Sequence, residues 1–217
     1  MSMKTILEKL DEGRQYRDID MSRIERRAED NGDMIVEGYA TVFEQPYLLW
    51  KWSDYEVWEV VDKEAFDETD MSDVIMQYNH EGRVFARGSN GTLAVGPDDV
   101  GLHTRARLSG TTLGREIYEE IDGGYSTKMS FGFTIGKEDR HEVEDHDTGL
   151  IKVTRRILSI SKLYDVSVVS LPANDATSIS ARSFAEGVIR EILEERQEAL
   201  KRARQKQKIR ILAGGIK

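Results

Sequence analysis

The chain has 217 residues, contains no cysteine and carries a formal net charge of −9 at neutral pH. This length suits one well-buried domain with appendages. The missing cysteines exclude disulfides, thiolate metal sites and a cysteine nucleophile, and the acidic balance argues against a general nucleic-acid binder. No apolar run approaches the ~20 residues of a membrane helix, and the amino terminus lacks the apolar middle of a secretory signal. Neither membrane insertion nor export is expected.

Alternating apolar residues bounded by turn residues dominate residues 34–169, which is typical of half-buried strands in an antiparallel sheet or barrel. Asn31-Gly32 predicts a tight hairpin between residues 23–28 and 34–43, because both residues adopt positive φ at low cost. Further strands are predicted at residues 56–61, 74–78, 92–95, 101–108, 130–135, 150–159 and 162–170.

Helical patterns interrupt and follow these strands. A short helix is predicted at residues 63–67, and a second over 113–122, capped by Thr112 and stopped by Gly123-Gly124. After Arg182 apolar residues recur at helical spacing, which predicts an amphipathic helix to about Gln205. This tail has ten basic and five acidic residues, whereas the rest of the chain is acidic. The contrast indicates a separate partner for the tail, or a helix folded back on the body.

Three segments far apart in the chain carry the residue types of a serine-nucleophile site. Ser130 lies in a segment with no glycine two places before it, so it would present its hydroxyl from a strand and not from a nucleophile elbow. His80 ends a predicted buried strand, where scaffolds place catalytic groups, and an imidazole can accept a serine proton at neutral pH. Asp165 lies on a mostly apolar strand face, where an acid needs a partner such as His80.

Each of these residues also has a structural explanation. Ser130 fits a small residue on the crowded inner face of a barrel, His80 a solvated loop residue, and Asp165 an acid on a solvated strand edge. His103 competes with Asp165 for the orienting position, although a solvent-facing strand position explains it better.

His141 and His146 suggest a metal site. They lie five residues apart, whereas the zinc-protease helix signature has its histidines four apart. Helical residues at a spacing of five are ~140° apart and cannot easily share one tetrahedral ion. Residues 137–147 are rich in Asp and Glu and are better explained as a mobile hairpin tip, so no metal or cofactor is predicted.

Taken together and in order, these segments resemble the prohead maturation proteases of tailed bacteriophages, which are similar at a distance to the herpesvirus assemblins. The sequence motifs that carry the resemblance lie at residues 37–43, 78–81, 101–102, 129–133 and 164–174. The resemblance implies a serine endopeptidase with Ser130 as nucleophile, His80 as base and Asp165 as orienting acid, although the family commonly has Glu at the last position. It also implies an oxyanion hole formed by the backbone amides of Ala173 and Asn174.

The expected fold is mainly β with peripheral helices, a closed or nearly closed antiparallel β-barrel of the assemblin-like type. It is expected over residues 22–181, between an amino-terminal arm at 1–21 and a basic amphipathic helix and tail at 182–217. By resemblance, the enzyme cleaves the scaffold or the removable arm of the phage major capsid protein, and itself, inside the immature capsid in the bacterial host cytoplasm.

No nucleic acid, membrane or cofactor is expected as a partner, and self-association into a homo-oligomer stays open. Two rival functions also stay open. The first is a non-catalytic capsid-assembly or scaffold factor that keeps the barrel, and the second is a metal-dependent hydrolase that uses His141 and His146.

Overall fold

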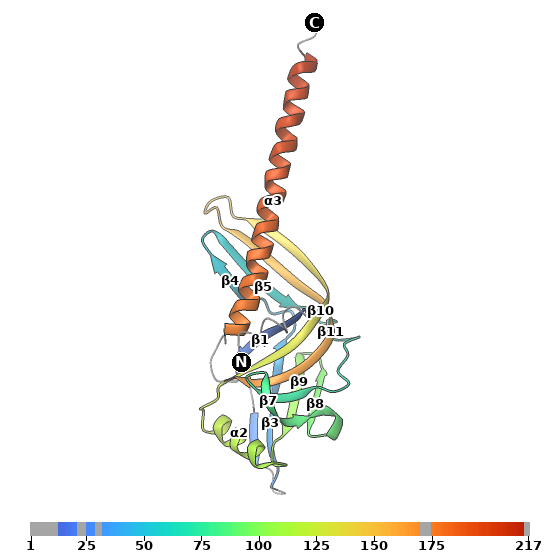
Figure 1. The fold of residues 1–217 in the computed structure, drawn as a ribbon, viewed down its shortest axis with the longest axis vertical. Helices are drawn as coiled ribbons and strands as arrows, with labels where there is room; N and C mark the ends of the chain where they lie inside the picture. Colours follow the sequence, from blue (N-terminus) through green and yellow to red (C-terminus); the bar gives the residue numbers. More distant parts are fainter. Residues whose placement is uncertain (1–12, 21–24, 29–31, 170–174, 215–217) are drawn as a thin grey trace.

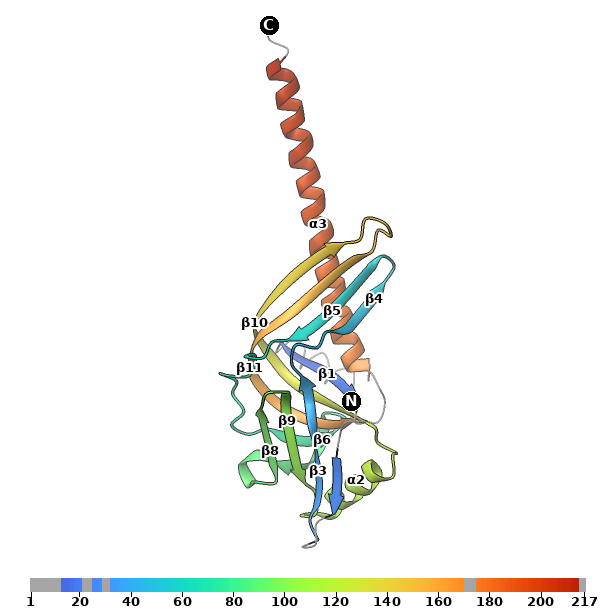
Figure 2. The same ribbon diagram turned by 180° about the vertical axis from the view of Figure 1, so that it is seen from behind.

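The computed structural model describes residues 13–20, 25–28, 32–169 and 175–214, and within them the chain forms two β-sheets and a long helix (Figures 1 and 2). The larger sheet has the order β1-β10-β11-β5-β4, and β6 and β7 extend it from β11. Its strands are β1 (Arg14–Asp20), β4 (Tyr47–Trp52), β5 (Tyr55–Val61), β6 (Ile75–Tyr78), β7 (Glu81–Arg87), β10 (Lys128–Glu144) and β11 (Ile151–Val169).

The smaller sheet has the order β2-β3-β9-β8 and is antiparallel throughout. Its strands are β2 (Glu25–Ala28), β3 (Met34–Val42), β8 (Leu93–Pro97) and β9 (Gly101–Arg107). The pairing of β2 with β3 confirms the predicted pairing of these two segments, and most of the predicted turn lies outside the described residues.

In the described part of the chain the sheets are accompanied by the short 3-10 helix η2 (Gly88–Asn90), by α2 (Thr112–Asp122) and by α3 (Asp175–Gly214). The predicted carboxy-terminal helix is present and longer than expected, so the predicted boundary at 181/182 lies inside it. Ile192 of α3 packs on the large sheet against Val57, Ile151 and Val153. Arg196 of α3 forms ion pairs with Glu142 and Glu144 of β10, and beyond this residue α3 extends away from both sheets (Figures 1 and 2). No helix in the described ranges is long and apolar enough to cross a membrane.

The main core lies along the paired strands β10 and β11. Phe131 and Phe133 of β10 stack with ring centroids 4.7 Å apart, and both are buried together with Met76 and Leu163. The residues of β10 and β11 that alternate with these core residues face the other side of the sheet, and they include Ser130 and Asp165. The apolar alternation in residues 129–133 thus fixes which side chains enter the core and which face the candidate site.

The mainly β character is confirmed, but the expected closed or nearly closed barrel is wrong, because neither sheet closes on itself within the described residues. The reason lies in β11, which changes its neighbour along its length. Its first half pairs with β5 and its last residues pair with β6, so the sheet branches and does not roll up. Both of these pairings are parallel, whereas the sequence pattern predicted antiparallel strands only.

The strands predicted at 150–159 and 162–170 are one continuous strand, β11. Irregular pairing with β10 between Thr134 and Glu138 lets the pair bend without a break. A Cβ at Gly136 would lie 2.7 Å from the Ser159 hydroxyl oxygen, so the glycine allows the close approach of the two strands at the bend.

Three further local predictions are corrected by the structure. Residues 63–67 form turns and not a helix. The cap of α2 is Thr111, whose hydroxyl accepts a hydrogen bond from the Gly114 amide at 2.9 Å, and not Thr112. Part of the amino-terminal arm is strand β1, which pairs with β10 from Arg14 to Asp20.

A buried ionic cluster fastens β1 to the large sheet. Arg17 of β1 forms a two-pronged ion pair with Glu59 of β5, with Nε 2.5 Å from Oε1 and Nη2 2.7 Å from Oε2. Arg155 of β11 also contacts Glu59, at 3.2 Å, and bonds Glu138 of β10. Tyr47 of β4 donates its hydroxyl to Glu59. Since all these groups are polar, a search for apolar periodicity does not find the contact that holds β1 in place.

Candidate active site

Gly132 is the centre of a row of residues that crosses three strands. It pairs with Tyr16 of β1 on one side and with Asp165 of β11 on the other. A Cβ on Gly132 would lie 2.5 Å from Oδ2 of Asp165 and 2.9 Å from Cε1 of Tyr16. The missing side chain therefore provides the space in which the carboxylate and the phenol ring approach each other.

Asp165 forms the central hydrogen bonds of this site. Its Oδ1 lies 2.5 Å from Nδ1 of His80, and the Ser167 hydroxyl donates to the same oxygen at 2.6 Å. His80 and Asp165 are each 2 % exposed, and Ser167 is fully buried. A carboxylate at such a position must be compensated by hydrogen bonds or opposite charge. The imidazole and the serine hydroxyl supply that compensation.

His80 reaches Asp165 from a tight turn between β6 and β7. Tyr78 pairs with Glu81, which leaves Asn79 and His80 as the two residues of the turn, and their φ angles are 50° and 60°. Positive φ at both positions is the pattern of a type I′ hairpin turn. The Asn79 amide donates to the Val168 carbonyl oxygen at 2.8 Å, which ties the turn to β11. His80 is therefore buried, and the polar loop expected after it is strand β7.

Ser130 lies one step along the same face of the sheet. It pairs with Ser167 across β10 and β11 and stands two residues from Gly132, so its side chain is on the side of Gly132 and Asp165. Its hydroxyl is buried, with the residue 1 % exposed, and has no hydrogen-bond partner among the described residues. An unsatisfied buried hydroxyl costs about 1–3 kcal/mol, so its presence in a folded protein needs an explanation.

The three residues of the predicted serine site thus share one buried face. His80 and Asp165 are in direct contact, and Ser130 lies one residue pair away. His103 is elsewhere, on β9 of the smaller sheet, with Nε2 3.2 Å from Glu37. The predicted oxyanion residues Ala173 and Asn174 lie outside the described residues.

Sequence reasoning gave no role to two residues that shape this site, Ser167 and Tyr16, and it interpreted a third, Gly132, only as room for a substrate backbone. Ser167 is two positions from Asp165 in a strand, so the alternation of β11 already puts both on one face. Gly132 was assigned no structural partner in the sequence, and only the strand register reveals Asp165 opposite it. No role was predicted for Tyr16, because its segment is rich in charged residues and was interpreted as an amino-terminal arm outside the domain.

The segment that suggested a metal site is solvent-exposed in the structure. His141 is an exposed residue of β10, opposite Thr154, and His146 is exposed in the turn that follows. Within the ranges given above, no group of three or more His, Asp and Glu side chains is arranged to hold a metal ion.

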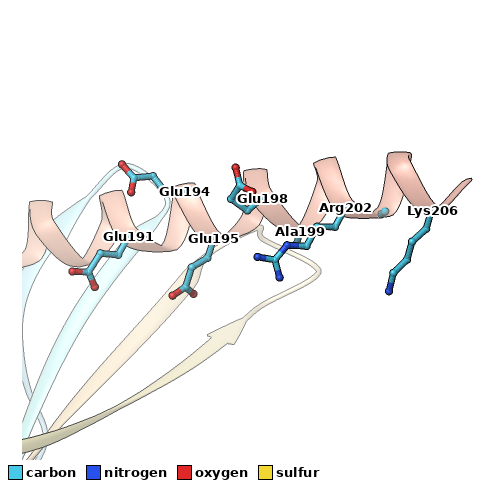
Figure 3. Close-up of a pocket in the computed structure, with 8 residues that line it drawn as sticks. Glu191, Glu194, Glu195, Glu198, Ala199, Arg202 and Lys206 are labelled. Atoms are coloured by element: carbon cyan, nitrogen blue, oxygen red, sulfur yellow. The ribbon is translucent and has the colours of Figure 1, made fainter. Parts of the chain in front are cut away.

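A surface hollow runs along α3, outside the row of Tyr16, Gly132 and Asp165 (Figure 3). It is lined by Glu191, Glu194, Glu195, Glu198, Ala199, Arg202, Ala203 and Lys206. Acidic residues line its first part and Arg202 and Lys206 its second part (Figure 3). Its lining contains neither a serine nor a histidine, so the buried face around Asp165 is the stronger candidate for a serine-nucleophile site.

Comparison with known families decides the assignment of the chain. Residues 22–188 match the family described as caudovirus prohead serine protease. The chain belongs to this family. The matched region of this prohead serine protease contains His80, Ser130 and Asp165, whereas β1 with Tyr16 precedes it. The family that was predicted from the short sequence motifs is confirmed.

One similar solved structure is the capsid assembly protease of bacteriophage T4. It shares 12 % sequence identity with this prohead serine protease at a TM-score of 0.37, and the match covers 72 % of this chain and 98 % of the T4 chain. A comparison with curated proteins gives no significant match.

Proposed function

We propose that this prohead protease is a serine endopeptidase in which Ser130 is the nucleophile, His80 the general base and Asp165 the acid that orients the imidazole. The observation that carries the proposal is the 2.5 Å contact between Nδ1 of His80 and Oδ1 of Asp165. It lies on the buried sheet face that also bears Ser130. Serine proteases on unrelated folds also hold their catalytic histidine by a carboxylate, and here a serine lies on the same sheet face as that pair.

The hydrogen bond to Asp165 assigns the roles of the two imidazole nitrogens. With Nδ1–H donated to the carboxylate, Nε2 is the nitrogen that takes the Ser130 proton. The serine oxygen then attacks the peptide carbonyl carbon, and Nε2 returns the proton to the leaving amine. Water subsequently cleaves the acyl-enzyme and restores the Ser130 hydroxyl.

Ser167 supports this chemistry through Asp165. Its hydroxyl donates to the same carboxylate oxygen that faces His80, at 2.6 Å. This bond fixes the rotation of the carboxylate that faces His80. The backbone amides of Ala173 and Asn174 stay the predicted donors to the oxyanion, where a positioned amide is worth about 3 kcal/mol.

The proposed substrates are the scaffold and the removable arm of the phage major capsid protein, together with the protease itself, inside the immature capsid in the host cell. Confinement there raises the local concentration of enzyme and substrate, so weak recognition is sufficient. Ser130 is only 1 % exposed, so a peptide reaches it after neighbouring groups have moved.

Co-expression with the cognate major capsid and scaffold proteins tests the proposal. Intact-mass analysis should find discrete fragments with the wild-type protease and none with Ser130→Ala or Asp165→Asn. A fluorophosphonate probe should add its mass to Ser130 in the wild type only. Fragments that persist in Ser130→Ala, or a wild type that yields neither fragments nor labelling, would refute serine catalysis. The second result would favour a non-catalytic assembly factor.

A further inference from the structure

Tyr16 of β1 packs directly on the imidazole of His80. The two ring centroids are 4.3 Å apart with the planes tilted by 55°, and Tyr16 is 0 % exposed. The Tyr16 ring also fills the space above Gly132, since a Cβ there would lie 2.9 Å from its Cε1. His80 is therefore contacted by the ring of Tyr16 as well as by the carboxylate of Asp165.

The residue after Tyr16 anchors it. The Arg17 side chain points to the other face of β1, where its two-pronged pair with Glu59 is buried. Its Nη1 donates to the Tyr16 carbonyl oxygen at 2.8 Å. A bidentate pair fixes orientation as well as distance. Through these bonds β5 holds the backbone of Tyr16, and so its ring, at a fixed position over His80.

We infer that Tyr16 is a positioning residue of the active site, which keeps the His80 imidazole in the rotamer that meets Asp165 and excludes water from their hydrogen bond. The turn that carries His80 fixes its backbone but leaves rotation about two side-chain bonds, and a ring packed at 4.3 Å removes most of that freedom. In a dry environment the bond to Asp165 is also stronger.

This inference assigns a role in the site to a strand that precedes the family-matched region. The match begins at residue 22, whereas β1 ends at Asp20. Its catalytic consequence rests on the proposed function, but the packing of Tyr16 on His80 can be tested without it.

Three full-length variants test the role of the ring. Tyr16→Phe keeps it, Tyr16→Leu removes it, and Tyr118→Leu removes a buried tyrosine of α2 as the matched control. Two properties are measured: the maximal rate of labelling by a fluorophosphonate together with its half-saturating concentration, and the downfield proton NMR signal of the His80 Nδ1–H. Thermal unfolding is recorded for each variant to compare the loss of stability.

Tyr16→Leu should lower the maximal labelling rate about 10–100-fold, since small misplacements of a catalytic group have effects of this size, while the half-saturating concentration stays unchanged. The Nδ1 proton signal should broaden or vanish through exchange with water. Tyr16→Phe and Tyr118→Leu should retain both. If Tyr16→Leu does not fold, Arg17→Lys takes its place, because it keeps the charge but loses the two-pronged pair and should give a smaller change in the same direction.

Wild-type labelling and an intact Nδ1 signal in Tyr16→Leu would overturn the inference, and so would equal losses in Tyr118→Leu. Failure of the proposed function looks different. In that case Ser130 of the wild type would not label at all, while the Nδ1 signal would still report whether Tyr16 positions His80.

Discussion

Gly132 stands directly opposite Asp165, and a methyl group on it would lie 2.5 Å from the Asp165 carboxylate oxygen Oδ2. Gly132→Ala should therefore push the carboxylate away from His80 and lower the labelling rate about 10–100-fold, the range expected for a small misplacement. Gly96→Ala is the matched control, because its Cβ would meet nothing within 4 Å in strand β8. Equal labelling of the two variants would show that the carboxylate position does not matter.

His80 occupies a backbone position that suits glycine better than histidine. Its φ of 60° lies in the left-handed region, as does the φ of 50° at Asn79. His80→Gly relieves this φ but leaves the buried Asp165 carboxylate without the imidazole, so we expect it to lower the melting temperature and to lose all cleavage of capsid protein. Asn79→Gly relieves the same turn and should keep cleavage. Melting temperatures and fragment masses of the two variants separate the turn from the imidazole, and activity in His80→Gly would contradict the assigned base.

Ser130→Ala should make the protein more stable. The buried hydroxyl has no partner among the described residues, so replacing it with a methyl-sized group should increase the free energy of unfolding by about 1 kcal/mol. Denaturant unfolding measures the gain, and Ser126→Ala is a suitable comparison, because the buried Ser126 hydroxyl donates to Glu120 and its loss should destabilise. A loss of stability in Ser130→Ala would indicate that the hydroxyl is satisfied and structural.

Ser167→Ala should reduce activity without abolishing it. The variant removes the 2.6 Å bond to Asp165 but leaves the contact of Asp165 with His80. We expect the maximal labelling rate to fall about tenfold, the lower end of the effects of supporting partners around a functional group. Ser167→Thr keeps a hydroxyl and should recover part of the rate. If the alanine variant labels at the wild-type rate, the hydroxyl does not help to orient Asp165.

Glu59 should make stability depend on pH below the ordinary range of glutamate. Burial alone would raise its pKa, but the charge and hydrogen bonds of Arg17, with the charge of Arg155, lower it below the ordinary glutamate value of 4.5. A lowered pKa means that the stabilising contribution is complete above about 4.5 and is lost as pH falls through the folded-state pKa. Wild-type stability should therefore decline in acid.

Glu59→Gln isolates this contribution. At neutral pH the variant leaves two buried guanidinium groups without their shared carboxylate, which should cost about 3–5 kcal/mol. The difference from wild type should shrink as pH falls below 4.5. Asp73→Asn is the control, since hydrogen bonds from Arg87 lower the pKa of this exposed carboxyl to about 2 and its loss should matter little. A constant difference at all pH values would contradict the ionised pair.

The sequence predicted the parts of this protein that depend on local patterns. Apolar alternation located most strands, and the sequence motifs around His80, Ser130 and Asp165 pointed to the candidate site. What it could not supply depends on register. The pairing of Gly132 with Asp165 is set by bulges and strand order, and neither has a local signature.

The largest error in the fold prediction has the same origin. Whether the sheet closes depends on which strands pair with β11 along its length. The residues of β11 carry no pattern that predicts its change of partner from β5 to β6. Strand β1 was not predicted because its segment is mostly charged and the ion pair that anchors it has no apolar pattern. From the sequence alone Arg17 and Glu59 are interpreted as solvated charges, whereas in the fold they are buried as an ion pair.

The helix α3 is continuous over 40 residues, which corresponds to about 60 Å at the rise of an α-helix. Near its middle it is fixed to the sheet through Ile192 and through ion pairs of Arg196 with Glu142 and Glu144, and its last turns have no sheet beside them (Figure 1). A continuous helix of this length is a semi-rigid spacer, unlike a flexible linker. If its far end is bound, the distance from that anchor to the β-sheets is set by the length of this one helix.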